Sequence, residues 1–279
     1  MKVLGKKNEV RSAVARARKT GRKIGLVPTM GFFHEGHLSL MRLCRSRCDL
    51  CVVSIFVNPT QFGPEEDFDR YPRDIKRDKA LARAESVDLI FAPSVEEMYD
   101  RETSTVILEN SVSRGLCGRS RPGHFQGVTT VVAKLFNVVQ PDVAFFGQKD
   151  LQQLTVIRRM VRDLDIPVLI EAGPTVREPD GLALSSRNAY LKPDQRKRAP
   201  ALYRTLSKGA ELLAGMTGDP SPLLEKLDRE IENATGGKMD YLSAVDEDME
   251  EVADASDCRY LAAALYLGST RLIDNVELA

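Results

Sequence analysis

The chain has 279 residues, a length typical of about two domains. Hydrophobic residues make up 43% and charged residues 29%, a composition that excludes a disordered, collagen-like or wholly coiled-coil protein. Forty Lys and Arg balance forty Asp and Glu, so the net charge indicates neither a nucleic-acid nor a membrane partner.

Helix and strand patterns alternate through the first part of the chain. Asn8 is a candidate helix cap, and the continuous apolar run 50–57 is typical of a parallel strand covered on both faces. We expect helices over 8–19, 36–47, 73–84, 125–139 and 150–162, and strands over 24–28, 50–57, 88–91, 105–108, 143–146 and 168–171. This rhythm predicts an α/β fold with a Rossmann-like, doubly wound parallel sheet.

Turn-forming residues cluster at 173–181 and indicate a domain boundary. Beyond it we expect helices over 196–213 and 222–233 and strands over 241–245, 260–267 and 270–276. Gly268-Ser269 between the last two strands predicts a hairpin. The expected division is therefore a larger domain, residues 1–175, and a small α+β domain, residues 176–279.

The strongest local signal is Met30-Gly31-Phe32-Phe33-His34-Glu35-Gly36-His37, where a predicted buried strand ends and a helix begins. Ligands of open α/β sheets bind at the carboxyl ends of strands, and a helix N-terminus favours phosphate. His34 and His37, three residues apart, lie on one helical face. Two solvent-facing histidines are the simpler alternative, and a zinc site lacks both the H-E-x-x-H pattern and a third ligand.

Polar residues follow two other predicted strands. Asn58 and Gln61 stand in Asn-Pro-Thr-Gln-Phe-Gly after the second strand, and Gly147-Gln148-Lys149-Asp150 joins a later strand to its helix. Arg121-Pro122-Gly123-His124 opens a further helix. Each block alone could be an ordinary loop, but together they predict one composite pocket at a single sheet edge.

A second signal lies downstream in Ser185-Ser186-Arg187, which can offer two hydroxyls and a guanidinium to a polyphosphate. With the His-Glu-Gly-His turn it resembles the two signatures of the HIGH-type nucleotidyltransferases. The ordered blocks from Ile24 to Leu191 resemble, within that superfamily, the pantothenate synthetase (pantoate–β-alanine ligase) family.

That resemblance implies a role for each matching residue. The catalytic residues it implies are His34, His37, Lys149 and Arg187, and the substrate-binding residues are Asn58, Gln61 and Gln153, with Gln61 and Gln153 holding pantoate and Gln61 also near β-alanine. The ATP-binding residues it implies are Met30, Gly31, His34, Gly36, His37, Gly147, Gln148, Lys149, Asp150, Val176, Leu184, Ser185, Ser186 and Arg187. Two departures are Leu184, where many relatives have Met, and the bulky Phe32-Phe33 pair in the pantoate pocket.

The resemblance also implies the reaction: ATP-dependent condensation of pantoate with β-alanine through a pantoyl adenylate, with release of pyrophosphate and AMP. ATP is a substrate, Mg²⁺ is held mainly through its phosphates, no protein metal site is expected, and the chain forms a homodimer. A different nucleotidyltransferase, an aminoacyl-tRNA synthetase fragment and a non-catalytic scaffold are the alternatives. An aminoacyl-tRNA synthetase fragment would be expected to show a basic, aromatic-rich RNA-binding surface, whereas acidic residues outnumber basic ones after Gly181.

Five cysteines and no apolar leader indicate a cytoplasmic protein without a disulfide framework. Cys44, Cys48 and Cys51 have spacing that loosely resembles a metal motif. Because the first two should end a helix while the third opens a strand, we expect buried thiols that do not converge.

Overall fold

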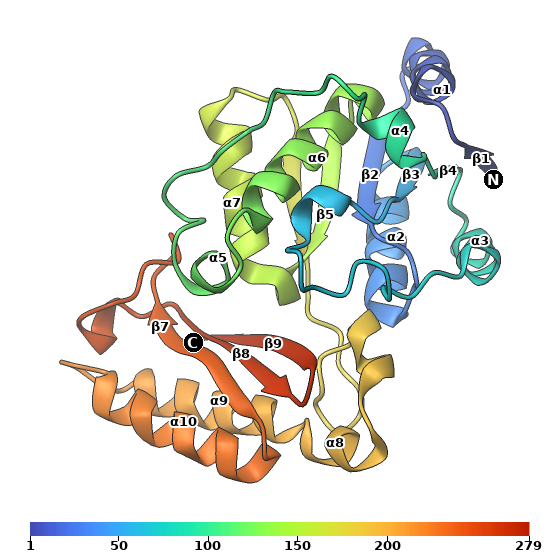
Figure 1. Cartoon of the computed structure of the whole chain (residues 1–279). Helices are drawn as coiled ribbons and strands as arrows, with labels where there is room; N and C mark the ends of the chain where they lie inside the picture. Colours follow the sequence, from blue (N-terminus) through green and yellow to red (C-terminus); the bar gives the residue numbers. More distant parts are fainter. Residues whose placement is uncertain (279) are drawn as a thin grey trace. The chain divides into compact units, whose positions relative to one another are not determined.

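Six parallel strands form the larger sheet of the computed structural model, which describes residues 1–278 (Figure 1). The strand order is β1-β4-β3-β2-β5-β6, and every neighbouring pair is parallel. The strands are β1 (Lys2–Leu4), β2 (Ile24–Thr29), β3 (Leu50–Ile55), β4 (Leu89–Phe91), β5 (Val143–Gly147) and β6 (Leu169–Gly173). The predicted doubly wound parallel sheet is confirmed.

Helices cover both faces of this sheet. Alternate side chains of the strands, such as Val27, Val53 and Phe145, pack with the buried residues of α2 and α3 into one core cluster. On the other face α1 and α6 pack together and against β2, and α6 is buried around most of its circumference. The helices between these strands include α1 (Lys7–Lys19), α2 (Glu35–Arg47), α3 (Ile75–Ala84), α4 (Val95–Met98), α6 (His124–Val139) and α7 (Leu151–Asp163).

The described residues divide into two compact units. Unit 1 comprises Met1–Asn110, Arg121–Gln148 and Val156–Pro174. Unit 2 comprises Ser111–Ser120, Lys149–Thr155 and the chain from Thr175 onward. The domain boundary that the sequence predicts between residues 175 and 176 stays a prediction.

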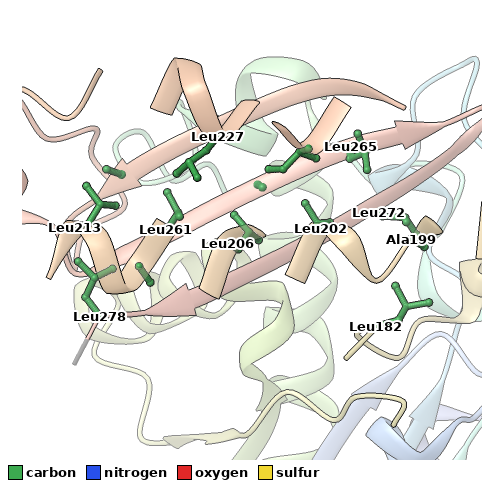
Figure 2. Packing of buried hydrophobic residues seen from close by; sticks show 14 of the residues in the cluster. Leu182, Ala199, Leu202, Leu206, Leu213, Leu227, Leu261, Leu265, Leu272 and Leu278 are labelled. Carbon is green, nitrogen blue, oxygen red and sulfur yellow. The ribbon is translucent and has the colours of Figure 1, made fainter. Parts of the chain in front are cut away.

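Unit 2 contains a three-stranded antiparallel sheet with helices packed on it. Leu202 and Leu206 of α9 and Leu227 of α10 meet Leu261 and Leu265 of β8 in its core (Figure 2). Tyr260 to Leu267 pairs with Thr270 to Glu277 around Gly268, so the predicted hairpin is confirmed. The elements are α5 (Leu116–Ser120), α8 (Pro193–Arg198), α9 (Ala201–Leu213), α10 (Ser221–Thr235), β7 (Lys238–Val245), β8 (Tyr260–Leu267) and β9 (Thr270–Glu277).

Three predicted elements differ from the structure. The segment 105–108 is no strand, because no described strand pairs with it. Helix α1 has its N-cap at Lys6 rather than at Asn8, and the carboxylate of Glu97 accepts a hydrogen bond from the Lys7 amide at 2.9 Å. The predicted helix 196–213 is two helices, α8 and α9, with Pro200 between them. The short strand β1 was not predicted.

The expected separation of three cysteines is wrong. Gly25 on β2 has no side chain, and a Cβ there would lie 2.4 Å from Sγ of Cys44 and 3.0 Å from Sγ of Cys48. Cys44 also shares a hydrogen bond with Cys51, which together with burial raises the pKa of the Cys44 thiol. The thiols therefore converge because Gly25 lets the end of α2 approach the sheet. All three are buried, as expected.

Candidate active site

The carboxyl ends of β2, β3 and β5 lie side by side, since β2 stands between the other two. The chain runs from β2 through α2 to β3 on one side, and from β5 through α7 to β6 on the other. The winding of the sheet therefore reverses between β2 and β5, and such reversals form the crevice where α/β proteins bind ligands. The turn 30–34, the residues 58–61 and the pair Gly147-Gln148 all leave the sheet at this edge.

A buried carboxylate holds the turn after β2. Gly31 and Phe32 both have positive φ angles, 83° and 51°, which turns the following amides toward α3. Asp78 of α3 accepts hydrogen bonds from the amides of Phe32 and Phe33, each at 2.8 Å. Burial raises the pKa of Asp78, although the two amide hydrogen bonds oppose the shift. The conformation that leads into His34 is thus fixed by a side chain that is distant in sequence.

The two histidines begin α2 together. Their ring centroids are 4.1 Å apart. Nδ1 of His34 accepts a hydrogen bond from the Gly36 amide at 3.2 Å, and Nδ1 of His37 accepts one from the His34 amide at 3.3 Å. Because Nδ1 is an acceptor in both rings, these hydrogen bonds assign the ring proton to Nε2. Each imidazole therefore has an Nε2–H donor at the start of a helix, an arrangement that suits an anion.

Met30, Asn58 and Gln61 form a connected group. The Gln61 amide donates to Sδ of Met30 at 3.3 Å, and its Oε1 accepts from Nδ2 of Asn58 at 3.1 Å. Asn58 is buried and caps the short 3-10 helix η1 (Pro59–Gln61) by accepting from the Thr60 amide. The hydroxyl of Tyr99 donates to the same Oδ1 at 2.8 Å. The structure therefore brings together the predicted residues that follow β2 and β3.

The backbone of Gly127 in α6 completes this group. Nδ2 of Asn58 also donates to the carbonyl of Gly127 at 3.1 Å. A Cβ on Gly127 would lie 2.4 Å from the carbonyl oxygen of Thr60 and 2.7 Å from Cα of Gln61, so only glycine permits this approach. The position of η1 therefore depends on the first turn of α6.

Unit 2 holds the other predicted residues. Lys149 and Asp150 belong to the short helix η2 (Gln148–Asp150) before α7, and Gln153 lies in the first turn of α7. The side chain of Asn275 on β9 donates to the carbonyl of Lys149 at 3.0 Å. Lys149 is thus tied through its backbone to the antiparallel sheet.

A short loop of unit 2 joins Val176 to the Ser-Ser-Arg segment. The amide of Leu184 donates to the carbonyl of Val176 at 3.0 Å, and Arg177 and Ala183 form an isolated antiparallel bridge. Oγ of Ser185 accepts from the Arg187 amide at 3.3 Å and caps the short helix η3 (Ser186–Tyr190). The predicted phosphate segment is therefore an ordered, capped turn.

Several residues that stabilise these groups were given no individual role from the sequence, among them Tyr99 and Gly127, which contact Asn58 as described above. Sequence contains no signal for Asp78, because its partners are backbone amides of a distant turn. Arg121 and His124 stand in a block that was singled out, but nothing in it indicated their contacts. The others are Glu66, which pairs with Arg121, Asp274, which pairs with Arg177, and Asn275, which donates to the carbonyl of Lys149.

The sheet reversal, the histidine-bearing helix start and the amide cluster beside it define an α/β protein with a candidate ligand site at this edge of the sheet. Comparison with known proteins narrows this class. The model of the pantoate-beta-alanine ligase family matches residues 2–277. The pantothenate synthetase of Moorella thermoacetica is 53% identical over 273 residues, covering 96% of this chain and 95% of that protein.

Solved structures agree. A pantothenate synthetase from Thermus thermophilus superposes with a TM-score of 0.89 at 45% identity, covering 100% of this chain and 99% of that chain. The pantoate-beta-alanine ligase of Francisella tularensis, solved with a β,γ-ATP compound and β-alanine, gives 0.85 at 35% identity, with 99% and 97% covered. The chain belongs to the pantoate-beta-alanine ligase family. It is an enzyme, a ligase whose reaction is the ATP-dependent condensation of pantoate with β-alanine.

Proposed function

We propose that this ligase works through an acyl adenylate. A carboxylate oxygen of pantoate attacks the α-phosphorus of ATP, a new P–O bond forms, and the bond to the β-phosphate oxygen breaks to release pyrophosphate. The free amine of β-alanine then attacks the activated carbonyl carbon, the C–O bond breaks, and AMP leaves as the amine loses a proton. The observation that supports this best is the pair of Nε2–H imidazoles at the reversal of the sheet.

Stabilisation of the negative charge on the phosphates is the task we assign to His34, His37, Lys149 and Arg187. None of them needs to form a covalent bond, since positioning and preorganised donors supply the rate. Both imidazoles donate through Nε2, while Lys149 and Arg187 contribute fixed positive charge. Met30, Gly31, Gly36, the segment from Gly147 to Asp150, Val176 and the segment from Leu184 to Ser186 bind the rest of the nucleotide through backbone groups and hydroxyls.

Pantoate recognition is the task of Asn58, Gln61 and Gln153. Neutral amides can bind both hydroxyls and a carboxylate, because each amide offers donors and an acceptor. In the structure the amide of Gln61 contacts Met30 and Asn58, which places it beside the turn that we assign to ATP. Gln61 is therefore suited to hold pantoate against the α-phosphate, and β-alanine afterwards.

We assign Mg²⁺ to the ATP phosphates. Mg²⁺ prefers oxygen ligands and usually keeps several waters, so its ligands would be mainly phosphate oxygens and water. Among residues 1–278 no group of three or more His, Cys, Asp and Glu side chains could hold a metal ion. When bound, the cation would neutralise phosphate charge that the imidazoles and Lys149 also face.

A homodimer and a cytoplasmic location complete the proposal. In unit 1 the residues Val106 and Leu108, in the segment that lacks a partner strand, are 53% and 57% exposed, which supports an association through this face. All five cysteines are free thiols, which is typical of proteins in a reducing compartment. In the described part of the chain, no helix is long and apolar enough to cross a membrane.

Exchange of labelled pyrophosphate into ATP tests the adenylate scheme. The exchange should proceed with pantoate and Mg²⁺ in the absence of β-alanine, and full turnover should release AMP. Formation of ADP, or an absolute requirement for β-alanine before exchange occurs, contradicts the scheme. Gln61→Ala and Gln153→Ala should raise the pantoate concentration needed for exchange by about 10- to 150-fold, as expected for the loss of a hydrogen bond to a charged group. Their KM for ATP should change little.

A further inference from the structure

An ion pair links the loop after η1 to the start of α6. The guanidinium of Arg121 donates to both oxygens of Glu66, from Nε at 2.7 Å and from Nη2 at 2.6 Å. The two side chains are only 13% and 26% exposed. Two parallel hydrogen bonds of this kind define the relative orientation of their partners, not only their distance. Residues 55 positions apart are therefore held in one geometry.

This pair also contacts the backbone of Gln61. Nη2 of Arg121 lies 3.4 Å from the carbonyl oxygen of Gln61, and Nδ1 of His124 lies 2.8 Å from the same oxygen. Nη1 of Arg121 lies 3.0 Å from Nε2 of His124. A neutral His124 satisfies both contacts, because Nδ1–H then donates to the carbonyl while Nε2 accepts from Arg121. Two donors thus converge on one peptide oxygen.

That peptide oxygen belongs to the residue that ends η1. Helix η1 is one 3-10 turn, a structure with few internal hydrogen bonds. Its start is held by Asn58, and its end, at Gln61, carries the amide that we assign to pantoate. If the last peptide of η1 rotated, the side-chain amide of Gln61 would move away from Met30, even with the surrounding buried side chains still packed.

We infer that Arg121, Glu66 and His124 are positioning residues for pantoate recognition, and that they act by holding the carbonyl of Gln61. Glu66 orients Arg121, and Arg121 and His124 then hold the last peptide of η1. The side chain of Gln61 is thereby kept ready before substrate arrives, and pantoate binding spends less free energy on ordering it. The inference rests on the proposed role of Gln61.

Glu66→Gln is the first test, with Asp240→Asn as its matched control. Asp240 accepts two hydrogen bonds from Arg271, and both side chains of that pair are 14% exposed, so the control removes a comparable charge from a comparable ion pair. Glu66→Gln should raise the KM for pantoate in pyrophosphate exchange by about 5- to 30-fold, which corresponds to one or two kcal/mol. The KM for ATP of Glu66→Gln should stay within about twofold of wild type. The KM values of Asp240→Asn for pantoate and for ATP should both stay within about twofold of wild type, because this control should change stability alone.

Substitutions of His124 test the same idea without removing a charge. The side-chain amide of His124→Asn can stand where Nδ1 stands and donate to the Gln61 carbonyl, whereas His124→Leu cannot. We therefore expect a nearly normal pantoate KM in His124→Asn and a raised one in His124→Leu. A role in folding alone would lower the melting temperature of both variants and leave the pantoate KM unchanged.

The outcomes separate the inference from the function on which it rests. If wild-type protein shows no pantoate-dependent exchange, the proposed function fails and the inference fails with it. If wild type exchanges but Glu66→Gln and His124→Leu keep a normal pantoate KM, or raise the KM of ATP equally, only the inference is overturned. Should Glu66→Gln not fold, the comparison of His124→Asn with His124→Leu decides alone.

Discussion

Replacing Asp274 by alanine should destabilise unit 2 by about 3 kcal/mol, because it leaves a guanidinium without its carboxylate. Asp274 lies on β9 and accepts from both Nη atoms of Arg177, at 2.6 and 2.8 Å. Its side chain is 3% exposed and that of Arg177 17%. Water therefore cannot easily replace the carboxylate when it is removed.

The magnitude follows from what Arg177 loses and keeps. Two hydrogen bonds to a charged group are together worth about 3 to 6 kcal/mol, and removal of one partner of a buried ion pair costs about 3 to 5 kcal/mol. Arg177 retains the carbonyl of Gly181 at 3.1 Å and lies 3.5 Å from the ring centroid of Tyr203. These contacts limit the loss, so we expect the lower end of the range.

Urea unfolding followed by circular dichroism measures this change. The control is Glu277→Ala, which breaks the exposed pair of Glu277 with Arg259 and should cost less than about 1 kcal/mol. The double variant Arg177→Met with Asp274→Leu should recover most of the stability, since no buried charge remains unpaired. The reasoning is refuted if Asp274→Ala and Glu277→Ala have the same unfolding free energy, or if the double variant is the least stable.

Three further predictions concern the reaction and its pH dependence. Arg187→Ala and His37→Ala should each slow adenylation in rapid-quench measurements by on the order of 10²-fold with a smaller effect on ATP dissociation; slowing confined to the β-alanine step would contradict the assigned roles. Gly127→Ala should raise the KM for pantoate, because the new Cβ would lie 2.4 Å from the carbonyl of Thr60 and displace η1; an unchanged KM would show that η1 tolerates the shift. Burial disfavours the charged form of Glu66, but hydrogen bonds from the Arg121 guanidinium more than offset it and hold its pKa below the usual value. The stability from that carboxylate is therefore present above its unfolded pKa, about 4.3, and lost as the pH falls through the lower folded pKa, so Glu66→Gln should flatten this part of the acid-unfolding curve.

Much of the sheet could be predicted because its signals are local. Buried, largely apolar runs such as Leu50–Ile55 and the regular alternation with helices predict parallel strands without knowledge of their partners. The same alternation places the residues that follow β2, β3 and β5 at one edge. That the residues next to Met30 and Asn58 lie together could therefore be predicted from sequence order alone.

The incorrect predictions arise where contacts with residues distant in sequence determine the structure. Asn8 is a good cap by residue type, but α1 starts earlier because Glu97, 90 positions away, satisfies the Lys7 amide. The residues 105–108 have the composition of a strand, yet composition cannot supply a partner, and Val106 and Leu108 remain exposed. The ion pair of Glu66 with Arg121 is invisible in sequence for the same reason.

The buried thiols at the end of α2 and on β3 can report local unfolding of this part of the enzyme. Cys44, Cys48 and Cys51 are buried, and the pKa of both Cys44 and Cys48 is raised. In the folded state, therefore, neither Cys44 nor Cys48 is a thiolate that a reagent can attack. Alkylation of these sulfurs must then wait until α2 separates from β2 and β3. The labelling rate of the native protein, followed by peptide mass, would report how often the helix that begins at the two histidines leaves the sheet. The proposed binding of ATP at that helix should slow this alkylation by mass action.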